Sequence, residues 1–300
     1  MAELPATGPQ PRPAPKPTEP STLAAIWSVL GGVVAPASLV GALLFYFGYV
    51  SAHAQFVYFG VDVDTLGFST QDFVMRAPQP LLVPVLLLLV SIAAALWTHA
   101  LVGRRLQSMS PAARRRLTAG LAVSGTAALG AALILLLAYP AMPAWDYYDL
   151  VTPLVLGLGA GLLVLAVRMS DSGPRPSRSS VVVLVLVVIA SVFWATATLA
   201  EWSGTGRAKA LARELHLLPA VVVDTSEPLF PGDEHVVETI IPDSGEQTYR
   251  FRYRGLRLLA EGDGRLFLVP ERWSPSGSTF VIPMDDARIR FRFVNEPPWG

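Results

Sequence analysis

The sequence predicts a membrane-embedded all-α bundle of five helices, followed by a small C-terminal α+β domain whose sheet is mostly antiparallel. Three observations predict this fold class: five long apolar runs precede residue 200, the loops between them alternate in charge, and the pattern beyond residue 200 changes to strand-like alternation. Apolar residues make up 52% of the chain and charged residues 15%. Soluble domains carry about 25% charged residues, so the composition is that of a membrane protein.

The five apolar runs provide the predicted spans, because a helix needs about 20 apolar residues to cross a bilayer. No Asp, Glu, Lys or Arg lies inside any run. Ion-coupled transport and voltage sensing normally use ionisable groups inside the membrane, so a coupled transporter is disfavoured. The fourth run is short and rich in glycine. The runs are Leu23–Val50, Leu81–Val102, Leu117–Tyr139, Leu150–Val167 and Val181–Leu199.

The charges of the connecting loops predict the orientation, since arginine and lysine are concentrated in cytoplasmic loops. The loops after the second and fourth runs are rich in arginine, whereas those after the first and third are acidic. This pattern places the N-terminus in the cytoplasm and residues 201–300 outside. Losing the fourth span would reverse the side of the tail. The deciding residues are Arg104, Arg105, Arg114, Arg115, Arg116, Arg168, Arg175 and Arg178 inside, and Asp62, Asp64, Asp72, Asp146 and Asp149 outside.

Composition divides the chain into three parts. Residues 1–21 are rich in proline and lack an apolar face, which predicts a disordered cytoplasmic arm. Residues 22–200 form the predicted five-span transmembrane domain, and residues 201–300 the predicted extracytoplasmic α+β domain. The chain has no cysteine, which excludes disulfides, zinc–thiolate sites, iron–sulfur clusters and a cysteine nucleophile.

The loop over residues 51–80 carries a helix-start signal. Ser69 has the properties of an N-cap, Asp72 completes a capping box, and Phe68 and Phe73 occupy the hydrophobic-staple positions. A helix is therefore predicted to begin near Thr70. Asp62 and Asp64, with His53 upstream, allow two interpretations: a hard-metal or Ca²⁺ site, or a solvated acidic turn, which is favoured because no third ligand stands at a defined spacing.

The tail is predicted to form a short amphipathic helix over Arg207–Leu218 and then a sheet with period-two alternation. Glu261–Gly264 has the composition of a tight turn and predicts a hairpin between the strands on either side. The predicted strands are Ala220–Val223, His235–Ile241, Thr248–Ala260, Arg265–Val269, Thr279–Ile282 and Ala287–Val294.

Two of these strands alternate arginine with apolar residues, which predicts a row of arginines on one face of the sheet. One interpretation is a face that binds anions such as phosphate, lipid headgroups or acidic polymers. The other is an ordinary solvent face on which arginines pair with cross-strand acids. Nucleic acid is disfavoured by the outside location. The candidate residues are Arg250, Arg252, Arg254, Arg288, Arg290 and Arg292.

Catalytic signatures are missing from the sequence. The tail has two histidines, His216 and His235, and no Gly-x-Ser-x-Gly, His-Glu-x-x-His, Ser-x-x-Lys or P-loop pattern. No catalytic residue, cofactor or metal site is therefore predicted.

Three short segments, Tyr58–Gly60, Leu66–Asp72 and Tyr253–Leu259, carry a family resemblance. On these residues the chain resembles uncharacterised multi-pass membrane proteins of actinobacteria. The resemblance implies a bacterial plasma-membrane location and carries over no site residue and no reaction.

Together these patterns predict an integral plasma-membrane protein that displays a non-enzymatic extracytoplasmic interaction or sensing domain. Its expected partners are the lipid bilayer and, at the C-terminal domain, an envelope protein or anionic ligand. The alternative is a transporter or channel component that works with a partner chain, since a pore gated by apolar constrictions needs no buried charge.

Overall fold

The structure is a computed structural model and describes residues 22–107, 110–141, 145–170, 177–242, 248–274 and 277–294. The chain divides within its first helix into two compact units, Met1–Leu43 and Leu44–Gly300. The predicted proline-rich arm, residues 1–21, lies outside the described residues. In the first unit the chain is helical from Thr22 onward. The second unit contains the end of α1 and all the other helices and strands.

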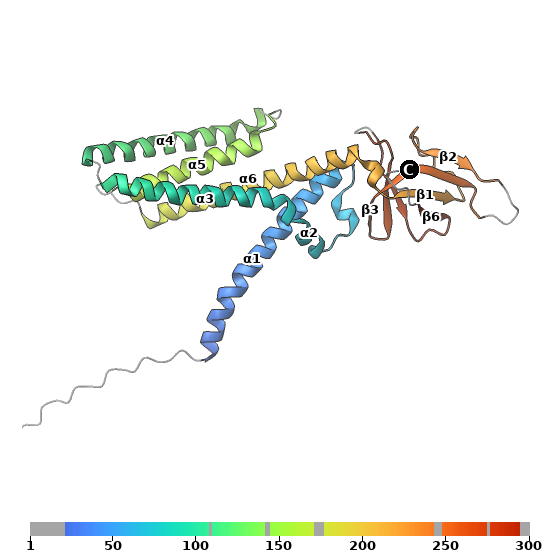
Figure 1. Cartoon of the computed structure of the whole chain (residues 1–300), viewed down its shortest axis with the longest axis horizontal. Coiled ribbons are helices and arrows are strands. Elements are labelled where there is room, and N and C mark those ends of the chain that lie inside the picture. Colours follow the sequence, from blue (N-terminus) through green and yellow to red (C-terminus); the bar gives the residue numbers. More distant parts are fainter. Residues whose placement is uncertain are drawn as a thin grey trace, which may run out of the picture. The chain divides into compact units, whose positions relative to one another are not determined.

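Long helices form at all five predicted apolar runs (Figure 1). They are α1 (Thr22–Val57), α3 (Pro78–Gln107), α4 (Pro111–Ala138), α5 (Tyr148–Met169) and α6 (Arg178–Arg213). α5, which covers the short fourth run, is a regular 22-residue helix. The separate helix expected over Arg207–Leu218 is instead the last part of α6, followed by the 3-10 turn η3 (Leu215–Leu217).

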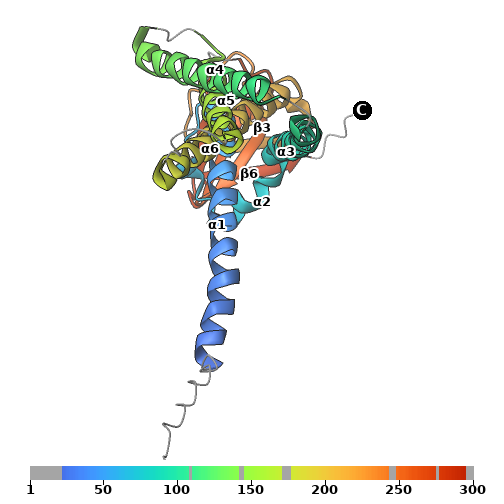
Figure 2. The ribbon, with the colours of Figure 1, turned by 90° about the vertical axis from the view of Figure 1, so that its left-hand side faces the viewer.

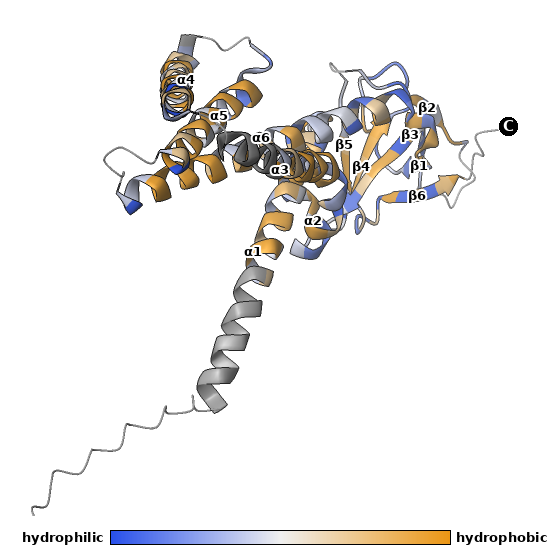
Figure 3. Cartoon of the chain, turned by 60° about the vertical axis from the view of Figure 1, so that its left-hand side comes forward, coloured by the Kyte–Doolittle hydropathy of each residue, from blue (hydrophilic) through white to orange (hydrophobic). Residues whose placement is uncertain are grey.

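Four helical segments of the described residues are long and apolar enough to cross a membrane: Ala37–Val57, Pro111–Ala138, Tyr148–Met169 and Arg178–Arg213. A fifth passes the same test only when α2 (Thr70–Arg76) and the start of α3 are taken together as one span bent by 48°. The helices and the C-terminal sheet therefore agree with the predicted layout, and among the described residues four helices, or five counting the bent pair, are long and apolar enough to span a membrane. Figure 3 shows apolar residues covering much of α4 and α5.

Glycines set the closest helix contacts. α4 packs on α5, and α5 packs on α6 (Figure 2). A Cβ at Gly159 would lie 2.9 Å from the backbone nitrogen of Leu129, and one at Gly125 would lie 3.0 Å from the oxygen of Gly159. Gly157 faces Ser191 of α6. The small residues at these points let the backbones approach closely, as expected of membrane helices.

The C-terminal sheet has the order β5-β4-β3-β1-β6, with β2 pairing to the first half of β3, and all of its pairings are antiparallel. The hairpin predicted at Glu261–Gly264 joins β3 to β4, with Asp263 and Gly264 both at positive φ, as a tight turn requires. The strands are β1 (Ala220–Thr225), β2 (Val237–Ile240), β3 (Phe251–Gly262), β4 (Arg265–Pro270), β5 (Phe280–Pro283) and β6 (Ile289–Val294).

One face of the sheet carries its main apolar core. Val221 and Val223 of β1 pack there with Tyr253 and Leu256 of β3 and with Leu266 of β4. Between these β3 residues the register shifts opposite β1, and Gly255 takes φ +83°. A side chain at Gly255 would strike the backbone oxygen of His235, so the irregularity requires glycine here.

The other face of β3 and β4 packs against the loop that follows α1. We call this contact the junction core. It joins Phe56, Val63 and Leu66 to Phe267, while Phe59 packs with Val269 and with the end of α6. η1 (Val63–Leu66) approaches the β3–β4 hairpin so closely that a Cβ at Gly262 would overlap the backbone of Leu66. The hydroxyl of Thr279 also donates to the Phe59 oxygen at 2.6 Å.

The helix-start signal in this loop is confirmed. α2 begins at Thr70 behind the N-cap Ser69, and both halves of the capping box with Asp72 are formed. The rings of Phe68 and Phe73 lie 5.8 Å apart, as a hydrophobic staple requires. The capping box and staple fix the direction in which the chain leaves the junction core and enters α3.

Candidate functional site

The strand order brings together the arginines of two strands that are far apart in sequence. β1 lies between β3 and β6, so that Asp224 stands directly opposite both Arg252 and Arg290, and Val222 stands opposite Arg292. Directly paired residues project to the same side of a sheet. We call this surface, made by Arg252, Arg254, Arg290 and Arg292 around Asp224, the arginine face.

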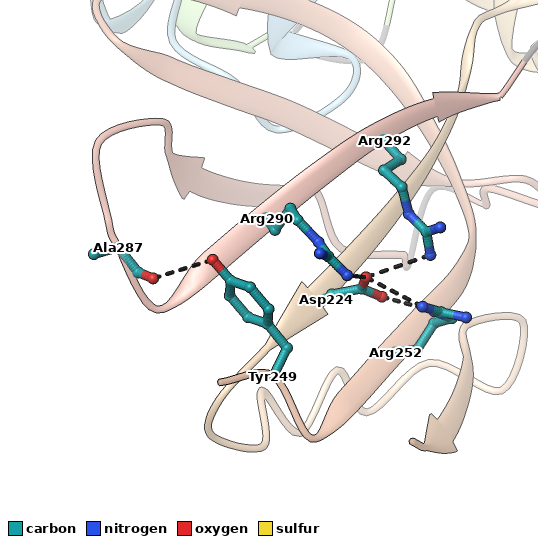
Figure 4. A network of polar contacts seen from close by, with 6 residues as sticks. All are labelled: Asp224, Tyr249, Arg252, Ala287, Arg290 and Arg292. Atoms are coloured by element: carbon teal, nitrogen blue, oxygen red, sulfur yellow. Dashed lines mark hydrogen bonds and ion pairs between the residues drawn. The ribbon is translucent and has the colours of Figure 1, made fainter. Parts of the chain in front are cut away.

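Asp224 is the centre of the arginine face (Figure 4). Its side chain is fully buried and accepts hydrogen bonds from Arg252 Nε at 2.7 Å and from Arg290 Nη2 at 2.7 Å. Arg292 Nη2 approaches the same carboxylate at 3.3 Å. Arg290 and Arg292 remain about half exposed, with side-chain exposures of 49% and 48%. One buried negative charge therefore holds three arginines, two of which keep much of their surface in solvent.

The arginines determine the ionisation of Asp224. Burial alone would raise the pKa of this carboxyl group, because it removes water from the charged form. The hydrogen bonds from Arg252 and Arg290, with the charges of Arg252 and Arg292, outweigh burial and hold the pKa of Asp224 below its ordinary value. The same contact raises the pKa of Arg252. At neutral pH the cluster is therefore one carboxylate and three guanidinium ions.

The remaining predicted arginines differ in their surroundings. Arg288 forms ion pairs with Asp286 at 2.8 Å and with Glu227 at 3.8 Å, so nearby carboxylates compensate its charge. Arg250 and Arg254 are exposed, and neither side chain has a hydrogen-bond or ion-pair partner among the residues that the structure describes. The row thus contains some arginines that pair with acids and others whose positive charge is open to solvent.

A pocket of about 560 Å³ opens beside the arginine face. Four arginines and one acid, Glu271, line it. Arg257 is buried and donates to Glu271 at 2.6 Å, and Arg252 and Arg292 share Asp224, so positive charge remains in excess. The full lining is Ala220, Val221, Val222, Arg252, Arg254, Gly255, Leu256, Arg257, Glu271, Arg292, Phe293 and Val294.

The acidic loop before α2 has a structural role. Asp62 caps η1 by accepting from the backbone nitrogen of Asp64 at 3.1 Å, and Asp64 accepts from the hydroxyl of Tyr49 at 3.3 Å. His53 stacks on Tyr49. Within the described part of the chain, no group of three or more His, Asp or Glu side chains is placed to hold a metal.

Sequence reasoning missed Asp224 and Glu271. The predicted strand ended at Val223, one residue before the acid that organises the arginine face. The run Ala220–Val223 is apolar throughout and marks no polar side, so only the pairing of β1 with β3 and β6 shows that Asp224 faces the arginines. Glu271 carried no local signal, because only the pairing of β3 with β4 brings it to Arg257.

Comparison of the chain with protein-family models, with curated proteins and with solved structures finds no match. The function therefore has to be inferred from the arrangement of its own residues.

Proposed function

We propose that this protein is an integral protein of the bacterial plasma membrane, of the actinobacterial kind that the sequence resembles. In this proposal its extracytoplasmic sheet domain binds an anionic ligand on the arginine face and catalyses no reaction. The observation that carries the proposal is the pocket lined by Arg252, Arg254, Arg257 and Arg292 against the single acid Glu271.

The chemistry of the pocket favours phosphate or carboxylate groups. Guanidinium groups bind such anions through pairs of parallel hydrogen bonds, which is a specific as well as a strong contact. Asp224 holds Arg252 and Arg292 in place beforehand, so less side-chain freedom is lost when a ligand binds. Arg254, whose side chain has no acid partner among the described residues, supplies a charge that is free to contact the ligand.

The junction core supports placing the sheet domain outside the cell. The acidic loop after α1 packs directly on β3 and β4, so the loop and the sheet must lie on the same side of the membrane. The loops before α4 and α6 carry the arginines that mark the cytoplasmic side. An exterior loop and an exterior sheet domain are therefore mutually consistent.

Binding can be tested with full-length protein in detergent micelles, using tripolyphosphate and poly-glutamate as probes. We expect Arg254→Gln and Arg292→Gln each to weaken binding about tenfold, in line with the loss of a charge-assisted hydrogen bond. The matched control is Arg265→Gln, an exposed arginine on the same sheet outside this pocket. An equal loss in the control would show that only overall charge matters and would refute the site.

The orientation can be tested by thiol labelling, because the chain contains no cysteine. Three exposed positions can be changed singly to cysteine: Ala112 and Ser179 in the first turns of α4 and α6, next to the arginine-rich connections, and Ser278 in the sheet domain. An impermeant maleimide applied to intact cells is expected to label only Ser278→Cys, and all three after lysis. Labelling of Ala112→Cys in intact cells would contradict the proposed topology.

A further inference from the structure

Two arginines outside the arginine face lie close together where α1, α2, α3 and α6 meet. Arg76 ends α2, and its guanidinium lies 4.4 Å from the ring centre of Phe68 and 5.9 Å from that of Phe56. Arg207, on α6, donates to the side-chain oxygen of Gln79 at 3.1 Å and to the hydroxyl of Ser51. Gln79, which Arg207 contacts, follows Arg76 by about one helical turn, so both arginines belong to the same corner of the fold.

Among the described residues, neither guanidinium group forms an ion pair. Within the part of the chain that the structure describes, Asp72 is the one acid that acts on Arg76, and its carboxylate is occupied by the backbone and hydroxyl of Ser69. No carboxylate acts on Arg207 there, and its Nε is buried without a hydrogen-bond partner. Two partly buried guanidinium groups in one corner of the fold are unfavourable unless an anion offsets their charge.

The pair lies where the apolar segments end. Ser51 directly follows the run that ends at Val50, and Gln79 stands just before the run that begins at Leu81. The side chain of Arg207 reaches back along α6 toward these residues, as helical side chains incline toward the helix N-terminus. In the proposed topology, on which this inference rests, the ends of these apolar segments and both arginines lie at the level of the lipid headgroups.

We propose that Arg76 and Arg207 together bind the phosphate group of an anionic phospholipid. The two guanidinium groups supply the charge, while Gln79 and Ser51 hold Arg207 in position. Phe56 and Phe68 pack beside Arg76 and limit its contact with water, which strengthens its attraction for phosphate. The site is separate from the arginine face and does not depend on its ligand. Bound lipid would fasten α2 and α3 to α6 at the membrane surface.

The test is the heat stability of full-length protein in mixed micelles of detergent with phosphatidylglycerol, phosphatidylcholine or inorganic phosphate. We expect phosphatidylglycerol to raise the melting temperature most, because its headgroup carries no cation to compete with the arginines. Arg76→Gln and Arg207→Gln are each expected to raise the concentration of phosphatidylglycerol needed for half of the effect about tenfold or more. Native mass spectrometry should show retained phosphatidylglycerol in the wild type and less in both variants.

The control variant is Lys209→Gln, which removes an exposed cation from the same helix and should leave the lipid response unchanged. An Arg207→Gln protein that folds and responds like the wild type would overturn the site. A response to inorganic phosphate equal to that with phosphatidylglycerol would overturn the lipid as its occupant. An equal response to phosphatidylcholine would overturn the preference for an anionic headgroup.

Discussion

Replacing Asp224 by alanine is expected to lower the free energy of unfolding of the sheet domain by about 2 to 4 kcal/mol. The change leaves three arginines together without their shared carboxylate, and removing one partner of a buried ion pair typically costs about 3 to 5 kcal/mol. We place the effect somewhat lower because Arg290 and Arg292 are half exposed and keep contact with water. Each of them can therefore be partly resolvated after the carboxylate is lost.

The loss can be measured by pulse proteolysis of the full-length protein in urea. Trypsin cuts after arginine, and the arginines of β3 and β6 are protected only while the sheet is formed. The urea concentration at half cleavage should fall for Asp224→Ala and stay near the wild-type value for the control Asp285→Asn, an exposed acid between β5 and β6. Equal midpoints for the two variants would refute the role given to Asp224.

The same carboxylate predicts a dependence on pH. Its pKa is lowered in the folded protein, so its contribution to stability is complete above the unfolded pKa, about 3.9 for aspartate. That contribution is lost as the pH falls through the folded pKa. The stability difference between wild type and Asp224→Asn should therefore be constant above about pH 5 and shrink below about pH 4. A difference that grew on acidification would contradict the lowered pKa.

Replacing Gly204 by alanine is expected to destabilise the contact between α1 and α6 by about 1 to 3 kcal/mol, the usual cost of overpacking. A Cβ at this position would overlap the backbone oxygen of Ser51, which belongs to a helix and cannot rotate away. The helices must then separate, and the contact from Arg207 to Ser51 is strained as well. The melting temperature of the full-length protein in detergent measures the effect.

Gly206 provides the matched control on the same helix. A Cβ there would have no heavy atom within 4 Å, so Gly206→Ala should be neutral or stabilising by up to about 1 kcal/mol through helix propensity. If Gly204→Ala lowers the melting temperature and Gly206→Ala does not, the loss is caused by the close approach of the α1 and α6 backbones at Gly204. Equal melting temperatures for the two variants would show that α1 and α6 are not held at this distance.

The local parts of the fold were predictable because their signals lie within a few residues. The capping box of Ser69 and Asp72 placed the start of α2, and Asp263–Gly264 placed the turn between β3 and β4. The continuation of α6 to Arg213 was not predicted, because polar residues such as Glu201 end the apolar run without ending the helix. Beyond Glu201 the helix is held by tertiary packing: Gly204 lies against Ser51 of α1, and Ala208 packs with Phe59.

The candidate site was predictable only in part. The alternation in β3 and β6 identified arginines that share a face within each strand. The alternation did not show that β3 and β6 lie on either side of β1 in the same sheet. That arrangement depends on the pairing of β1 with both strands, which are distant in sequence. The joining of the loop after α1 to the sheet likewise depends on contacts such as that of Thr279 with Phe59.

The sequence by itself determined the apolar helices, the strand positions and the alternation of arginines, because hydrophobic period and chain length act locally. The tertiary structure alone decided which arginines contact Asp224, which line a pocket, and that Arg207 of α6 reaches the start of α3 close to Arg76. The physical reason is that charge compensation depends on distance in space. Local sequence does not set that distance for residues on separate strands and helices.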